Sequence, residues 1–142
     1  MEDTVKLAGI LAKHGVDLID CSSGGNHPAQ KIAAGPLQVT GGAYQAQYAA
    51  AVRSVYGVNG TETLKGHPSI LVAAVGGIRN GEVAEEVLQQ GQADVVFVGR
   101  QFQKDPATIW TFAEQLGVQI KVAHQIEWAF RGRGVIGKGK AA

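Results

Sequence analysis

Two short glycine-containing segments have the residue types needed to hold a phosphate group. Gly76-Gly77 follows one apolar run, and Gly99-Arg100 follows the next. Glycine has no Cβ, so an anion can approach the backbone N–H groups closely. Arginine adds a positive charge and a planar set of donors that suits phosphate. Glycines that only permit tight strand-to-helix turns are the simpler interpretation of either segment alone, but the pair together with Arg100 favours a phosphate site.

Other common chemical motifs are not found in the sequence. The segment Gly76–Gly81 lacks the G-x-G-x-x-G spacing of a dinucleotide turn, and no G-x-x-x-x-G-K-[ST] phosphate loop occurs. The four histidines lie in separate segments and form no metal-ligand pair at i, i+4. The single cysteine, Cys21, cannot form an intrachain disulfide, and we expect it to be a small buried residue. No metal site is predicted.

Composition narrows the class of protein. The 142 residues suffice for one domain with an apolar core, since 45% of them are hydrophobic. The net charge of +1 provides no field that would attract nucleic acid or an anionic membrane surface. The acidic N-terminus is unlike a signal peptide, and no apolar run is long enough for a membrane helix. We therefore expect a cytoplasmic protein that contacts neither nucleic acid nor membrane.

Helices and strands are predicted to alternate along the chain, and they would bring the two glycine segments together. The first expected element is a helix capped by Asp3 or Thr4 and ended by Gly15, followed by a strand at 16–21 and a long irregular segment containing Pro28 and Pro36. A helix at 44–55, a loop at 60–69 and a strand at 70–75 come next. The last expected elements are a helix at 81–90, a strand at 94–98 and a helix from Asp105-Pro106 to Leu116. This alternation predicts an α/β fold with a parallel sheet. The carboxyl ends of parallel strands meet at one edge, where ligands of such folds bind.

Several segments resemble the C-terminal part of the old yellow enzyme family, the FMN-dependent NAD(P)H oxidoreductases and ene-reductases built on a TIM barrel. The resemblance is carried by Gly15–Gly25, Val75–Ile78, Ala93–Arg100 and Asp105-Pro106, and it extends from about Asp3 to Arg131. It implies a partial (β/α)8 barrel that comprises helix 5 and strand-helix units 6 to 8. Residues 1–131 would form this C-terminal part of a flavin-binding barrel, and 132–142 a flexible basic tail.

The resemblance also implies a cofactor site. In the family, the backbone after strand 7 and the Gly-Arg pair after strand 8 hold the FMN phosphate, which corresponds here to Gly76, Gly77, Gly99 and Arg100. The intact family enzyme uses NAD(P)H as reductant and reduces a small-molecule alkene.

The catalytic half of the family site has no counterpart in this sequence. The family's substrate-binding histidines, its proton-donating tyrosine and its flavin-facing basic residue lie on earlier strands. Tyr44, Tyr48 and Tyr56 fall on a predicted helix, so none is expected to replace the acid. No catalytic residue is assigned, and we expect an FMN-binding oxidoreductase fragment that is inactive alone.

Two alternatives remain open. Three parallel strands cannot close a barrel, so the chain could be a non-catalytic phosphate-binding or assembly module that pairs with another half-barrel or with copies of itself. A self-sufficient flavodoxin-like domain is less favoured because such folds normally have about five strands.

Overall fold

The computed structural model describes residues 1–24, 28–29, 42–59, 62–63 and 69–131. The elements occur in the order α1 (Glu2–Lys13), β1 (Leu18–Cys21), α3 (Ala46–Tyr56), β2 (Val58–Asn59), β3 (Glu62–Thr63), β4 (Leu71–Val75), α4 (Gly81–Gln89), β5 (Val95–Phe97), α5 (Arg100–Lys104), α6 (Thr108–Gln115), the 3-10 helix η2 (His124–Ile126) and α7 (Glu127–Arg131).

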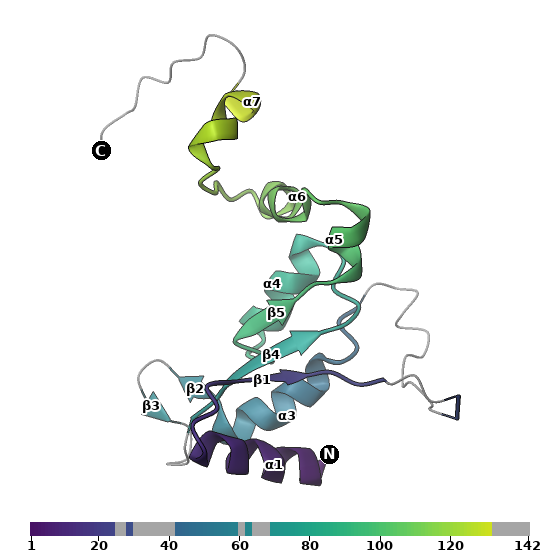
Figure 1. Ribbon diagram of the computed structural model, residues 1–142, viewed down its shortest axis with the longest axis vertical. Coiled ribbons are helices and arrows are strands. Elements are labelled where there is room, and N and C mark those ends of the chain that lie inside the picture. Colours follow the sequence, from purple (N-terminus) through teal and green to yellow (C-terminus); the bar gives the residue numbers. More distant parts are fainter. Residues whose placement is uncertain (25–27, 30–41, 60–61, 64–68, 132–142) are drawn as a thin grey trace.

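Strands β1, β4 and β5 form a parallel sheet with β4 in the centre (Figure 1). Leu18 of β1 is in register with Leu71 of β4, and Ala73 of β4 is in register with Val95 of β5. The predicted α/β class and the parallel pairing of the three strands are therefore confirmed. Strands β2 and β3 form a separate antiparallel pair. Because β3 lies within the segment 60–69 that was expected to be a loop, that part of the loop prediction is wrong.

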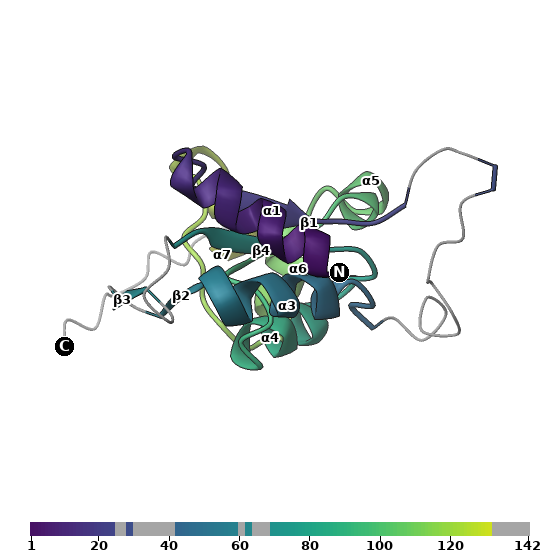
Figure 2. The ribbon, with the colours of Figure 1, turned by 90° about the horizontal axis from the view of Figure 1, so that it is seen from below.

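The core lies between one face of the sheet and the helices. Figure 2 shows α3 and α4 on the same side of β4. Alternate strand residues point to this side and pack against small or branched residues of the helices. The buried cluster includes Cys21, Val72 and Ala74 from the strands and Ala8, Ala49, Val52 and Val87 from α1, α3 and α4. Leu71 and Phe97 alternate with the inward residues, and each remains 40% exposed.

The first helix begins earlier than the sequence suggested. Asp3 and Thr4 lie inside α1 and do not cap it, which corrects the predicted start. Glu2 and Asp3 occupy the first turn, where negative side chains interact favourably with the helix dipole. Gly15 follows the helix with φ +82°, the left-handed conformation predicted for it.

The region after β5 contains three helices that were not predicted, namely α5, the 3-10 helix η2 and α7, in addition to the predicted helix that corresponds to α6. The short helix α5 begins at Arg100, and α6 begins at Thr108 instead of Pro106. The predicted cap at Asp105 is wrong, because Ala107 is the N-cap of α6 and Asp105 is the residue that ends α5. The Asp105 carboxylate instead holds the segment between the two helices: its Oδ1 accepts the N–H of Ala107 at 2.8 Å, and its Oδ2 accepts the Thr111 hydroxyl at 2.9 Å.

Some predictions fall on other parts of the chain. The irregular segment before residue 42 lies largely outside the described residues, and the expected tail at 132–142 lies wholly outside them. None of the helices in the described ranges is long and apolar enough to cross a membrane.

Candidate phosphate-binding site

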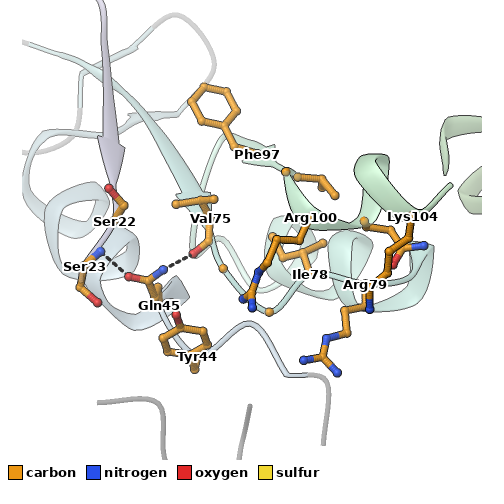
Figure 3. A pocket seen from close by; sticks show the side chains of 15 residues that line it. Ser22, Ser23, Tyr44, Gln45, Val75, Ile78, Arg79, Phe97, Arg100 and Lys104 are labelled. Carbon is orange, nitrogen blue, oxygen red and sulfur yellow. Dashed lines mark hydrogen bonds between the residues drawn. The ribbon is translucent and has the colours of Figure 1, made fainter. Parts of the chain in front are cut away.

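A cavity of about 430 Å³ opens at the carboxyl ends of the three parallel strands (Figure 3). We call it the strand-end pocket. Its lining comprises Ser22, Ser23, Tyr44, Gln45, Val75, Gly76, Gly77, Ile78, Arg79, Phe97, Val98, Gly99, Arg100, Gln101 and Lys104. All four residues predicted to hold a phosphate are among them, so the structure brings Gly76-Gly77 and Gly99-Arg100 to one cavity.

The backbone conformation requires glycine at two of the three glycine positions in the pocket, but not at the third. Gly76 and Gly77 have φ values of +102° and +80°, which residues with a Cβ rarely adopt. A Cβ on Gly76 would overlap Nε2 of Gln45, and one on Gly77 would overlap the carbonyl oxygen of Gly42. Gly99 has φ −105°, and a Cβ there would meet no atom within 4 Å. The need for a left-handed turn thus accounts for Gly76 and Gly77, whereas Gly99 lines the pocket at a position where nothing in the described structure would obstruct a Cβ.

The charged residues of the pocket all have the same sign. Arg79, Arg100 and Lys104 line it, and none of the described residues that line it is an aspartate or a glutamate. Figure 3 shows these three cations at one end of the pocket and Ser22 and Ser23 at the other. All three cations are exposed, so their charge is partly screened by water. The pocket is therefore suited to an anion that reaches its cationic end from solvent.

Two of these cations, Arg79 and Lys104, were missed by the sequence prediction, which named only Arg100. Arg100 and Lys104 stand four residues apart on α5, a spacing that places them on the same helix face. This signal could be read only if α5 had been predicted. Arg79 lies two residues after Gly77, so its proximity to the phosphate segment was visible in the sequence.

Gln45 is a polar side chain buried beside the pocket. It is 3% exposed, and its Oε1 accepts the backbone N–H of Ser23. Its Nε2 donates to the carbonyl oxygen of Val75 at 3.0 Å. Gln45 therefore joins the chain after β1 to the last residue of β4, as the dashed lines of Figure 3 indicate. Nothing in the sequence around Gln45 indicated that it would be buried while the nearby Gln47 is exposed.

Tyr44 also lies at the pocket, which corrects one sequence prediction. Tyr44 was expected on a helix and was set aside for that reason, but it occupies a turn before α3. It is half-buried, and its Cδ1 lies 3.2 Å from the position that a Cβ of Gly77 would occupy. Tyr48 and Tyr56 do lie on α3, as predicted.

Neighbouring titratable groups do not add a second chemistry to the pocket. Cys21 is 5% exposed, as expected for a buried thiol, and both this burial and the negative charge of Asp20 raise its pKa. Among the described residues, no group of three or more histidine, cysteine, aspartate or glutamate side chains could hold a metal ion. His27 and His67 lie outside the described residues.

Comparison with known proteins shows which curated proteins this chain is similar to. The chain is 50% identical to an NADH:flavin oxidoreductase of Gibberella zeae over 99% of its length. It is 38% identical to an NADPH dehydrogenase of Bacillus cytotoxicus over 88% of its length. The predicted resemblance to flavin oxidoreductases is confirmed. No family model matches the chain.

The chain covers only part of these flavin oxidoreductases. It spans 30% of the Gibberella zeae protein and 31% of the Bacillus cytotoxicus protein. This share is consistent with the C-terminal part of an old yellow enzyme family protein.

Proposed function

We propose that the chain supplies the phosphate-binding part of an FMN site in a partial (β/α)8 barrel. Gly76, Gly77, Gly99 and Arg100 would hold the phosphate through backbone N–H groups and the guanidinium. The observation that carries this proposal is the convergence of these residues, with two further cations and no acid, in one pocket at the carboxyl edge of a parallel sheet.

The residues present fit a phosphate monoester. Such a group carries a charge of about −1.5 to −2 at neutral pH, and the pocket presents three cations against it. The open space at Gly99 allows close approach to the main chain there. A volume of about 430 Å³ is within the range of small-molecule pockets, although the pocket is open at one side.

FMN bound here would supply the hydride chemistry of an NAD(P)H oxidoreductase acting on a small-molecule alkene. The residues of this chain bind and orient the cofactor through its phosphate, and no residue of the chain is assigned to proton transfer to a substrate. We therefore expect FMN binding without alkene reduction by the chain alone.

Titration of the chain with FMN, followed by the quenching of flavin fluorescence, tests the proposal. Riboflavin, which lacks the phosphate, should bind at least about tenfold more weakly, since a charge-assisted contact contributes about 1.5–3 kcal/mol. Arg100→Met should weaken FMN binding about tenfold, for the same reason. Lys121→Met removes an exposed cation outside the pocket and is the matched control. Equal binding of FMN and riboflavin would contradict the proposal.

A second candidate is an assembly module that pairs with another half-barrel or with copies of itself. The observation that favours it is the exposure of Leu71 and Phe97, each 40%, on the sheet face turned away from the main helical cluster. The chain covers 30% of the Gibberella zeae relative, so about 70% of that protein's length has no counterpart here. A second half that covers this face could correspond to that part. Light scattering of the purified chain at micromolar concentration tests it: a monodisperse monomer would argue against assembly.

A further inference from the structure

The amide of Gln45 connects two backbone segments that end at the same pocket. Ser23 lies just after β1, and Val75 is the last residue of β4. Gln45 accepts from the N–H of Ser23 and donates to the carbonyl oxygen of Val75 at 3.0 Å. Both the carbonyl and the amide nitrogen of this buried side chain are therefore used within the protein.

The second of these hydrogen bonds acts on the peptide group between Val75 and Gly76, two residues that line the strand-end pocket. The carbonyl of Val75 and the N–H of Gly76 belong to one planar peptide unit, and no cis peptide occurs among the described residues. In a trans unit the two groups point in opposite directions. When Gln45 fixes the direction of the Val75 carbonyl, it also fixes the direction of the Gly76 N–H.

Gln45 also lies close to residue 76. Glycine is favoured at residue 76 by its φ of +102°, and a Cβ there would overlap Nε2 of Gln45 and displace the amide from its position. The N–H of Ser23 is already donated to Gln45, which makes it unavailable to a ligand. Gln45 thus has a different effect on each segment. The N–H of Ser23 is occupied by the protein, and the N–H of Gly76 is held in a set direction.

We propose that Gln45 is a positioning residue that orients the Gly76 N–H toward a phosphate monoester in the strand-end pocket. This inference rests on the proposed function, because it assigns a role within the same FMN site. Gln45 itself does not contact the phosphate in this scheme. It acts through the Val75–Gly76 peptide.

The test compares three variants of the full chain by FMN titration and by amide hydrogen exchange without ligand. Gln45→Met keeps the length of the side chain and removes both hydrogen bonds. Gln45→Glu keeps an acceptor for Ser23 but, when ionised, has no donor for Val75. Gln89→Met is the matched control, since Gln89 is an exposed glutamine outside the pocket that bonds only Glu85 in the described structure, at 2.6 Å.

Gln45→Met should raise the Kd for FMN about tenfold, because the Gly76 N–H would no longer be held in the direction of its charge-assisted hydrogen bond to the phosphate, and it should abolish exchange protection at the Ser23 amide. Gln89→Met should change neither. Gln45→Glu adds a readout that general destabilisation would not give. A protonated glutamic acid can donate to Val75, so the ratio of its Kd to that of the unmodified chain should fall toward one as the pH is lowered. Taking this ratio at each pH cancels the titration of the FMN phosphate.

Each outcome decides between the inference and the proposed function. If the unmodified chain binds FMN and Gln45→Met binds it within twofold, the positioning role is overturned while the proposed site stands. If the unmodified chain does not bind FMN, the proposed function fails, and the positioning role fails with it. If Gln45→Met does not fold, Gln45→Glu decides: a Kd ratio that does not change with pH would overturn the inference.

Discussion

The two edges of the parallel sheet use polar residues in opposite ways. At the amino edge, Arg53 Nε and Asp94 Oδ1 form an ion pair of 2.8 Å whose side chains are 23% and 13% exposed. Asp94 Oδ2 also accepts the N–H of Val72 at 2.9 Å, and Arg53 donates to the carbonyl oxygen of Gly91 at 3.1 Å. The charges of Arg53 and Asp94 are thus neutralised by each other.

At the carboxyl edge, three exposed cations line the strand-end pocket without an acid, and the backbone there is held by the neutral amide of Gln45. An ion pair satisfies its own charges, whereas a group of cations at the rim of a pocket favours the binding of an anion. The amino edge thus stabilises the sheet, and the carboxyl edge is available for a ligand. Substitutions at the two edges should therefore separate stability from binding.

The largest expected effect is on stability, from Asp94→Ala at the amino edge. It leaves the Arg53 charge and the Val72 N–H without their partner, and loss of one member of a largely buried pair costs about 3–5 kcal/mol. Urea denaturation followed by circular dichroism measures the free energy of unfolding. The Kd for FMN of the folded fraction should remain unchanged.

The control for this variant is Asp3→Ala. Asp3 pairs with Lys6 at 3.9 Å on the surface of α1, with both side chains exposed, and it lies in the first turn of the helix, so its removal should lower the free energy of unfolding by no more than about 1 kcal/mol. A loss of FMN affinity by folded Asp94→Ala would show that the two edges are coupled, which contradicts the separation of roles.

An intermediate effect on both properties is expected from Gly77→Ala at the carboxyl edge. The new Cβ would overlap the carbonyl oxygen of Gly42 and would force a residue with a side chain to adopt φ +80°. Such strain costs about 1–3 kcal/mol. Because relief requires movement of the backbone that lines the pocket, FMN affinity should fall together with the free energy of unfolding. Thermal denaturation and FMN titration of the same preparation measure the two, and unchanged stability would refute the structural requirement at residue 77.

The sequence was sufficient to predict the features that depend on local patterns. The apolar runs of β4 and β5 are bounded by glycines, so their positions, their parallel pairing and the meeting of Gly76-Gly77 with Gly99-Arg100 could be predicted. Gly15 was also correctly predicted as the left-handed residue after α1. These features follow from hydrophobic periodicity and from the geometry of parallel strands.

The features that were missed depend on contacts between distant parts of the chain. Gln45 lies 22 residues from Ser23 and 30 from Val75, and Arg53 lies 41 residues from Asp94. Nothing in the local sequence of a glutamine or an arginine indicates a partner so far away. Lys104 was missed for a local reason, since the five residues of α5 are too few to show helical periodicity.

The smallest expected effect on stability, with the clearest effect on binding, comes from Gly99→Ala. At φ −105° alanine is sterically acceptable, and its Cβ would meet no atom within 4 Å. Stability should therefore be unchanged or higher by about 0.4–1 kcal/mol, because alanine reduces the entropy of the unfolded chain. The same methyl group would occupy space in the pocket that the phosphate needs, and a steric conflict of about 1–3 kcal/mol weakens binding about tenfold.

Gly99→Ala is measured by FMN titration beside urea denaturation, with Gly15→Ala as its counterpart outside the pocket. Gly15 also has open space around a Cβ, but its φ of +82° makes alanine unfavourable, so this variant should lose stability and keep the FMN affinity of its folded fraction. The two alanine substitutions thus have opposite signatures. If Gly99→Ala bound FMN as tightly as the unmodified chain, the open space at residue 99 would not receive the phosphate, and Gly99 would belong with the glycines required only by the fold.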